Sequence, residues 1–302
     1  MRRLFTVAAI LACAACSSGS QLATPTLNSP SDSATSALRG WPAAAKKPIL
    51  FVADLQNNVV HLYDPNTPNP QPEVSITDGI LQPTGLAVDA KGTLYVNNVG
   101  YNHNGIAVYA PGQTKPKMFI KTSGYYGIAL DSKGDIFATS VGGSVYGYKP
   151  GAKKPFETIG GFVNPVGIAI DSKNNIWVAD DSLSKVFTIP AGTKTVKNAA
   201  LVGLNDPDGL CFGTGDVLYV GNYGASTSFV TLYHQGSKKP FAKISDGISA
   251  PTLNGITASD IFFQSNQTTN VVGYKKGSKK PFSTITGNGD PLGIASWPLV
   301  KK

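Results

Sequence analysis

Arginine, glutamate and histidine are scarce in this sequence of 302 residues. Its three arginines all precede position 40, and it holds only two glutamates and three histidines. Proteins that read nucleic acid depend on clustered arginine and lysine together with base-reading groups, so the absence of arginine from residues 40–302 argues against that class. Proton transfer in catalysis uses histidine or a carboxylate in most enzymes, so the sequence offers few candidates for it.

Cysteine is also scarce. Cys13 and Cys16 lie near the N-terminus, and Cys211 follows in the apolar run Gly209-Leu210-Cys211-Phe212. A thiol in such a run packs as a small hydrophobic group. If the first segment is removed or carries lipid, no internal disulfide can form, and the core alone must stabilise the fold.

Residues 1–15 read as an export signal. Arg2 and Arg3 precede an apolar stretch over residues 4–12, which is followed by small residues. The stretch is too short to span a bilayer. The sequence Ala14-Ala15-Cys16-Ser17-Ser18 resembles a bacterial lipoprotein signal, in which Cys16 becomes the lipid-bearing N-terminus. Cys13 is the alternative lipidation site, and an ordinary cleaved signal peptide is the alternative to lipidation.

Residues 16–48 are rich in Ser, Thr, Ala and Pro and show no apolar periodicity, which is typical of a disordered tether. A tether of this composition holds a domain about 30 Å from its anchor. We therefore expect an exported protein that is lipid-anchored to the membrane and faces the periplasm or the cell surface. Secretion without an anchor is the alternative.

A short glycine motif repeats along the rest of the chain. The pattern Gly-[Ile/Leu]-[Ala/Thr/Cys] occurs at spacings of 38 to 46 residues, at Gly85, Gly127, Gly167, Gly209, Gly255 and Gly293. A period of this length indicates a propeller or a solenoid. Three of the apolar runs end in Asp-x-Lys-[Gly/Asn], which is typical of tight turns, so we interpret these aspartates as structural.

Three more strands follow the first five glycine runs, and another set of three precedes the first run. The second has a central aromatic residue and a polar exit, at Asp54, Asn98, Ser140, Asp180, Asn222 and Ser265. The third usually ends at tyrosine, and the fourth opens with proline, which suits an edge strand because it lacks a ladder donor.

No helical period appears, so residues 49–298 predict an all-β fold, a six-bladed β-propeller with four antiparallel strands per blade. The spare strand at residues 291–295 should complete the first blade and close the ring, and residues 299–302 form a tail.

The best-formed repeat carries a family resemblance. Pro165-Val166-Gly167-Ile168-Ala169-Ile170-Asp171, then Asn175-Ile176-Trp177-Val178-Ala179-Asp180, then Lys185-Val186-Phe187, resembles the NHL repeat, and the resemblance extends over residues 49–297. It implies a six-bladed propeller of the group that includes the gluconolactonase-like and streptogramin lyase-like proteins. Function varies across that group, so the fold alone does not supply one.

The resemblance also implies a possible metal site. The residues before the repeat glycines should face the channel, and Asp208 and Asn254 are the two strong oxygen donors among them. Pro207-Asp208-Gly209 and Asn254-Gly255 look like the metal-binding motifs of the gluconolactonase-like family. Their order is reversed here, and the family's first-blade glutamate has no counterpart. A divalent-metal-dependent, lactonase-like hydrolase with Ca²⁺ or another divalent cation is therefore the alternative function, whereas our main interpretation needs no cofactor.

Two loops that leave second strands are longer than the others, at residues 97–105 and 221–228. They and a neighbouring loop offer amide, imidazole and tyrosine groups to a ligand: Asn98, Tyr101, His103, Tyr126, Asn222 and Tyr223. Such groups beside a channel suit a sugar or a peptide. We interpret the protein as a monomeric, non-catalytic binding module for a protein, peptide or glycan of the cell envelope. The competing interpretation is that Asn and Gly merely form turns.

Lysine contributes 23 of the 26 positive charges that give the net charge of +8. More than half of the 23 lysines fall in or beside the turns between third and fourth strands. These turns should lie opposite the polar loops. A lysine-rich side favours contact with anionic envelope material, and the alternative is that the lysines protect the outer strands from edge pairing and keep the protein soluble.

Overall fold

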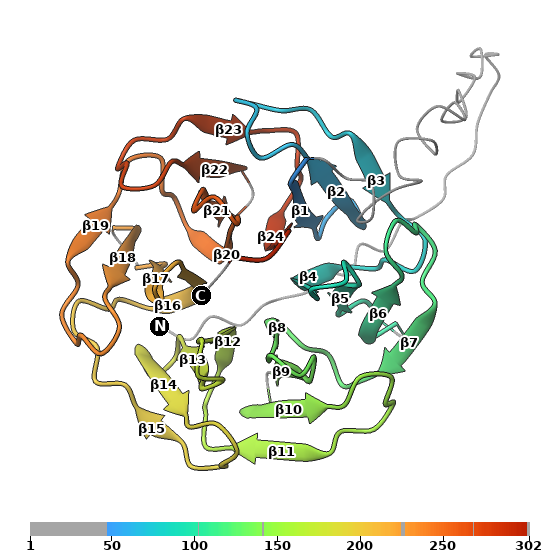
Figure 1. The fold of residues 1–302 in the computed structure, drawn as a ribbon, viewed down its shortest axis with the longest axis horizontal. Coiled ribbons are helices and arrows are strands. Elements are labelled where there is room, and N and C mark those ends of the chain that lie inside the picture. The colour runs from blue at the N-terminus through green and yellow to red at the C-terminus, as the bar shows by residue number, and fades with distance from the viewer. Residues whose placement is uncertain (1–46, 102, 141, 225–226, 268, 301–302) are drawn as a thin grey trace, which may run out of the picture.

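The computed structural model describes residues 47–300 except 102, 141, 225–226 and 268. The described residues form twenty-four strands in six antiparallel sheets of four strands each, arranged as a ring (Figure 1). This confirms the predicted all-β, six-bladed propeller. Among the described residues, no helix is long and apolar enough to cross a membrane. The predicted signal, most of the tether, Cys13 and Cys16 lie outside the described residues.

Blades 2 to 6 follow chain order from the innermost strand to the outermost. Blade 2 comprises β4 (Pro83–Val88), β5 (Leu94–Asn98), β6 (Gly105–Tyr109) and β7 (Met118–Lys121). Blade 3 comprises β8 (Ile128–Leu130), β9 (Ile136–Ser140), β10 (Ser144–Tyr148) and β11 (Glu157–Gly160). Blade 4 comprises β12 (Pro165–Ile170), β13 (Ile176–Asp180), β14 (Lys185–Ile189) and β15 (Lys197–Asn198). Blade 5 comprises β16 (Pro207–Gly213), β17 (Val217–Asn222), β18 (Phe229–Tyr233) and β19 (Ala242–Ile244). Blade 6 comprises β20 (Pro251–Ile256), β21 (Phe262–Asn266), β22 (Asn270–Tyr274) and β23 (Ser283–Ile285).

Blade 1 joins the two ends of the ring. Its innermost strand is β24 (Pro291–Trp297), which pairs with β1 (Ile49–Asp54), followed by β2 (Val59–Tyr63) and β3 (Val74–Ile76). The pairing is antiparallel and places Phe51 opposite Ala295. Closure by the C-terminal strand is therefore confirmed, and it satisfies backbone groups that an open ring would leave exposed at a sheet edge.

The core lies between neighbouring blades, because the inner strands are buried on both faces. Trp177 of blade 4 meets Phe212 of blade 5 edge to face at 5.7 Å, and Tyr219 stacks on Phe262 of blade 6 at 4.7 Å. Aromatic side chains at these interfaces bury large apolar areas. The central aromatic residues of the second strands thus hold adjacent blades together.

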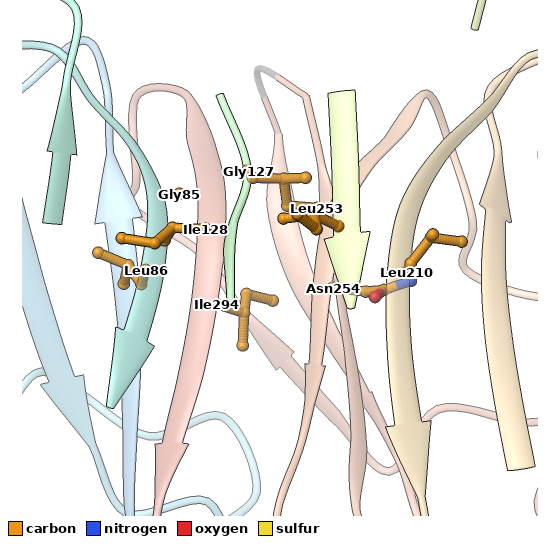
Figure 2. A pocket seen from close by; sticks show the side chains of 9 residues that line it. Gly85, Leu86, Gly127, Ile128, Leu210, Leu253, Asn254 and Ile294 are labelled. Atoms are coloured by element: carbon orange, nitrogen blue, oxygen red, sulfur yellow. The ribbon is translucent and has the colours of Figure 1, made fainter. Parts of the chain in front are cut away.

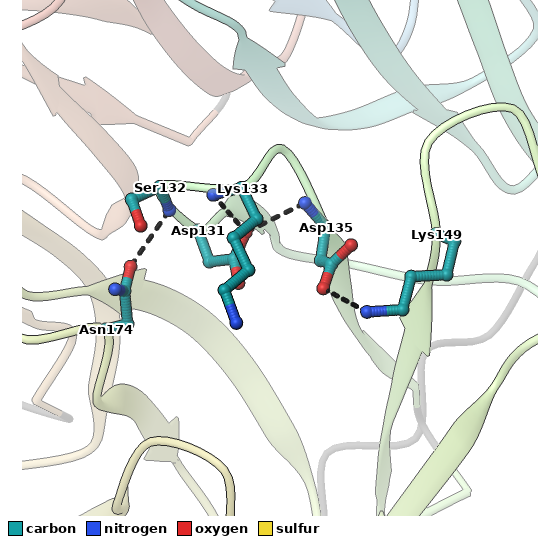
Figure 3. Close-up of polar contacts among 6 residues, drawn as sticks. All are labelled: Asp131, Ser132, Lys133, Asp135, Lys149 and Asn174. Carbon is teal, nitrogen blue, oxygen red and sulfur yellow. Dashed lines mark hydrogen bonds and ion pairs between the residues drawn. The ribbon is translucent and has the colours of Figure 1, made fainter.

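The Asp-x-Lys turns between first and second strands are structural, as predicted. Asp131 Oδ1 accepts hydrogen bonds from the backbone N–H of Lys133 and of Asp135, and Asn174 Oδ1 of blade 4 accepts one from Ser132 N at 2.9 Å (Figure 3). The turns therefore link blades as well as strands.

An ion pair connects these turns to those between third and fourth strands. Lys149 Nζ lies 2.7 Å from Asp135 Oδ2 in blade 3, and Lys276 Nζ lies 2.7 Å from Asp260 Oδ2 in blade 6. In blade 5, Gln235 Nε2 donates to Asp216 Oδ2. Both kinds of turn thus lie at the end of the innermost strands away from their opening prolines. We call this end of the ring, with residues 89–93 and 110–117 of blade 2 and their equivalents, the lysine side.

Blade 6 departs from the predicted alignment, by two residues in its innermost strand and by one residue in its second strand. In five blades, the proline that opens the innermost strand pairs with the polar residue that ends the second strand: Pro83 with Asn98, Pro165 with Asp180, Pro207 with Asn222, Pro251 with Asn266 and Pro291 with Asp54. In four of these blades the repeat glycine follows two residues after the proline, whereas blade 6 has Leu253 there. The assignments of Gly255 as the repeat glycine and of Ser265 as the polar exit were therefore wrong.

Side-chain space confirms this correction. A Cβ at Gly167 would lie 1.9 Å from the carbonyl oxygen of Asp208 in the next blade, and one at Gly85 would lie 2.3 Å from that of Tyr126. A Cβ at Gly255 would instead meet the side chain of Ile294. In the innermost strand, the shift of two residues keeps every side chain on the same face, so alternation could not reveal the error there.

Candidate functional site

The central channel narrows at a ring of side chains, one from each innermost strand. Five blades supply an aliphatic residue directly after the repeat glycine position and the sixth supplies an amide: Leu86, Ile128, Ile168, Leu210, Ile294 and Asn254 (Figure 2). The cavity between them measures about 30 Å³. It has room for one or two water molecules. This cavity is therefore too small to enclose an organic ligand.

Asn254 is the polar member of the ring, and it has a polar neighbour behind it. Its Nδ2 lies 3.3 Å from Gln264 Oε1, whose own Nε2 donates to the carbonyl of Thr252 at 2.8 Å. Asn254 is 6% exposed, and its Oδ1 has no hydrogen-bond partner among the described residues.

The other blades carry valine or alanine at the position of Gln264: Val52, Val96, Ala138, Val178 and Val220. Blade 6 therefore holds a buried amide pair where its five counterparts are apolar. Sequence reasoning missed Gln264, although an alignment of the six second strands could have revealed a glutamine where the other five strands have valine or alanine.

Asp208 occupies a different position from Asn254. It precedes the repeat glycine Gly209, and its counterpart in blade 6 is Thr252. Asp208 thus lies nearer the channel mouth, at the start of β16, than Asn254 does on β20. Burial is the main cause that raises the pKa of Tyr126. The nearby carboxylates of Asp208 and Asp181 raise this pKa further.

These donors do not make a complete metal site. No group of three His, Cys, Asp or Glu side chains in the described part of the chain could hold a metal ion. Asp208 and Asn254 offer one carboxylate and one amide at two levels of the channel, whereas hard cations take six or more oxygen ligands. The residues therefore do not fit the metal centre that the gluconolactonase-like resemblance implies.

The three histidines belong to separate contacts. His61 Nδ1 lies 2.8 Å from Ser75 Oγ, and burial lowers the pKa of His61. His103 packs against Phe119 with ring centroids 4.9 Å apart, and His234 stacks on Phe241 at 3.9 Å. Each contact stays within one blade, in blades 1, 2 and 5.

Asn98 and Asn222 have structural partners. Each is fully buried, and each amide oxygen accepts a backbone N–H from the segment that enters the same blade, from Leu81 at 2.8 Å and from Asn205 at 2.9 Å. Asp54 and Asp180 accept backbone donors in the same way. These two asparagines therefore shape the face that the sequence predicted for binding, and their side-chain oxygens are already engaged.

The tyrosines of that face are more accessible to solvent than the two buried asparagines. The loops that leave second strands adjoin those that enter innermost strands, because Val99 N donates to Gln82 O and Tyr223 N donates to Asp206 O. We call these two sets of loops the mouth face. Tyr101 is 89% exposed on it.

Tyr223 and Tyr126 lie on the same face and are partly buried. Tyr223 Oη donates to Gln267 Oε1 at 3.3 Å, which ties the loop of blade 5 to blade 6. Blades 2 and 5, which carry Tyr101 and Tyr223, lie opposite each other across the ring (Figure 1). Of the predicted ligand-binding residues, these tyrosines and His103 keep side-chain surface toward solvent.

Comparison with known proteins supports the fold. No family model matches the sequence, and no curated protein matches it. A solved chain from the "Crystal structure of Nidogen/Laminin Complex" superposes with a TM-score of 0.70 at 17% identity, over 82% of this chain and 98% of that one. A chain of the Kuenenia stuttgartiensis hydrazine synthase gives 0.47 at 14% identity, over 53% of this chain and 48% of that one. At these identities, the first likeness supports the propeller fold alone.

Proposed function

We propose that this protein is an exported, membrane-anchored propeller that binds a protein, peptide or glycan of the cell envelope through its mouth face, without catalysis. The observation that carries the proposal is Tyr101, an aromatic side chain left 89% exposed on the face where loops gather around the channel. Tyrosine is favoured at binding surfaces because it combines an apolar ring with a hydrogen-bonding tip.

The channel geometry supports binding on the face rather than in the interior. The cavity between the six side chains of the ring measures about 30 Å³, whereas pockets that enclose a small organic ligand measure roughly 300 to 1,000 Å³. Asn98 and Asn222 stiffen the rims of the two facing loops by accepting backbone donors. A rigid face with exposed aromatic groups lowers the entropic cost of binding.

The structural neighbour supports a macromolecular partner. It comes from a crystal structure of a nidogen/laminin complex, so a propeller of the same fold occurs in a complex of two proteins. The inference to this chain is by analogy of fold, and we propose a protein or peptide as the first class of partner to test.

The anchor is proposed from the sequence. Residues 14–18 resemble a lipoprotein signal with Cys16 as the lipidated residue and Cys13 as the alternative. Ile49, where the first strand begins, pairs with Trp297 at the lysine side. A tether that precedes it would reach the propeller on that side and leave the mouth face pointing away from the membrane.

The test is a binding assay with residues 47–302, which contain every strand and the ring closure. Solubilised envelope proteins and an immobilised glycan array serve as probes. We expect Tyr101→Ala and Tyr223→Ala each to weaken capture about tenfold or more, as truncation of an aromatic anchor does. The matched control is Phe241→Ala, which removes an aromatic ring 49% exposed on the lysine side. Unchanged capture in both tyrosine variants would refute the mouth-face proposal.

A further inference from the structure

A lysine-rich unit recurs at the outer rim of the propeller. The sequence Lys-Lys-Pro-Phe follows the third strand of blades 3, 5 and 6, at residues 153–156, 238–241 and 279–282. Each copy follows a glycine with positive φ, of 78°, 75° and 73°. The phenylalanine N–H donates to a third-strand carbonyl at 2.8, 2.9 and 2.9 Å. The three copies therefore have one geometry at equivalent positions of the ring.

The lysines of these units are exposed and form no ion pair among the described residues. All six are exposed: Lys153, Lys154, Lys238, Lys239, Lys279 and Lys280. Among the described residues, ion pairs form only at Lys47, Lys149 and Lys276. The nearby carboxylates of Asp135, Asp216 and Asp260 lie in the first-to-second turns and are engaged there. Six ammonium groups are thus available to an external anion.

Phenylalanine accompanies the lysines. Phe156 and Phe241 are 45% and 49% exposed, and the Lys149 ammonium lies 4.3 Å from the centre of the Phe156 ring. Lysines that only protect an edge strand or maintain solubility need no exposed aromatic ring beside them. Basic residues next to exposed apolar rings are instead typical of surfaces that bind the headgroup region of a membrane.

The three units lie on one side of the ring. They occupy equivalent positions in the turns between third and fourth strands of blades 3, 5 and 6, whose places in the ring are shown in Figure 1. The first described residue, Lys47, also lies on this side, 3.8 Å from Asp64 at the end of the third strand of blade 1. A flat anionic surface could therefore meet all three units while the mouth face stays free.

We propose that the lysine side docks on an anionic phospholipid membrane, with the six lysines at the phosphate headgroups and the phenylalanine rings at the headgroup boundary. This goes beyond the proposed function, since the contact needs neither the mouth face nor the lipid anchor. Each lysine near an anionic leaflet strengthens binding roughly fivefold at low salt. The contact must weaken steeply as salt screens the charges.

The experiment measures sedimentation of residues 47–302 with vesicles of phosphatidylcholine containing about 30% phosphatidylglycerol, a fraction within the range of anionic membranes. We expect binding to these vesicles and none to pure phosphatidylcholine. K238Q/K239Q should reduce the partition coefficient at least tenfold. The matched control K121Q/K185Q removes two exposed lysines at the mouth end of the ring. Lys121 ends the fourth strand of blade 2 opposite Gly105, and Lys185 begins the third strand of blade 4 opposite Asp180, so this variant should bind as the unmodified protein does.

Three results would overturn the proposal. The first is binding to neutral vesicles that is as strong as binding to anionic vesicles. The second is a loss of binding in K121Q/K185Q as large as that in K238Q/K239Q. The third is retention on immobilised dextran sulfate without any binding to vesicles, which would assign the surface to an acidic glycan. Phe241→Ala should lower the binding that persists at high salt, and no effect would remove the aromatic part of the contact. Tyr101→Ala should leave vesicle binding unchanged, so this test and that of the mouth face fail separately.

Discussion

At the scale of single residues, asparagine plays two roles here. Asn98 and Asn222 close hydrogen bonds at the ends of second strands, where a buried amide is fully used. Asn254 lies in the aliphatic ring of the channel, and its oxygen lacks a partner among the described residues. A buried polar atom without a partner costs about 1 to 3 kcal/mol, so blade 6 loses stability where its counterparts gain it.

Replacing the amide pair of blade 6 by the residues of blade 5 should stabilise the protein. We expect Asn254→Leu/Gln264→Val to raise the free energy of unfolding by about 1 to 2 kcal/mol, because the substitution removes the unpartnered oxygen and completes the aliphatic ring. Urea unfolding measures the change.

The matched control introduces the same pair in blade 5. Leu210→Asn/Val220→Gln should lower the free energy of unfolding by a comparable or larger amount, since it buries two amides in an apolar site. A double variant of blade 6 that is less stable than the unmodified protein would show that the amides are better satisfied than the structure indicates.

At the scale of the elements, tyrosines at the ends of third strands hold the segments that connect the blades. Tyr109 Oη donates to the carbonyl of Asp78 at 2.7 Å, and Tyr233 Oη donates to that of Val202 at 2.8 Å. Tyr63 Oη donates to Asn288 Oδ1 at 3.1 Å in the segment that enters blade 1. Each bond fixes the connection into the blade that carries the tyrosine.

The buried tyrosines of the blades should make the protein less stable at alkaline pH. Burial raises the pKa of Tyr63 and of Tyr95 to about 12. The unfolded chain ionises its tyrosines near pH 10. A folded pKa above the unfolded one contributes stability that is complete below pH 10 and is lost as the pH rises from 10 to 12. The melting temperature should therefore fall across this window.

The tyrosinate absorbance measures the same transition. We expect the buried tyrosines to ionise together with unfolding, whereas Tyr63→Phe should reduce the fall in melting temperature above pH 10. Tyr101→Phe, at an exposed position, is the control and should follow the unmodified protein. A melting temperature that stays constant up to pH 12 would contradict the prediction.

At the scale of the whole molecule, the closed ring separates two surfaces. The mouth face carries Tyr101, Tyr126 and Tyr223, and the lysine side carries the Lys-Lys-Pro-Phe units. The innermost strands run from one surface to the other, and the aliphatic ring between them leaves room for one or two waters. The two proposed contacts can therefore form at the same time.

Metal addition tests the lactonase-like alternative on the whole protein. We expect Ca²⁺, Mg²⁺, Mn²⁺ and Zn²⁺ to leave the melting temperature unchanged, because a ligand stabilises only the state that binds it and Asp208 with Asn254 supplies too few donors. Asp208→Ala is the control. A metal-dependent rise in melting temperature that disappears in this variant would restore the metal-dependent hydrolase as the leading interpretation.

The architecture could be predicted from the sequence alone. The period near forty residues, the turn aspartates and the edge prolines are local signals, so they gave the number of blades, the four strands of each and the closing strand. Local signals suffice because turn geometry and strand alternation depend on residues close together in the chain.

The residues that line the channel and the polar groups that are engaged could not be predicted, because both depend on how distant segments pack. The Gly-Ile-Thr sequence at residues 255–257 matches the repeat motif, but it lies two residues after the true repeat position at Leu253. A shift of two residues leaves the alternation of the strand unchanged. The partners of Asn98 and Asn222 lie seventeen residues away, at Leu81 and Asn205. Hydrogen-bond partners and channel neighbours come from segments that meet only when the blades pack, so spacing along the chain does not reveal them.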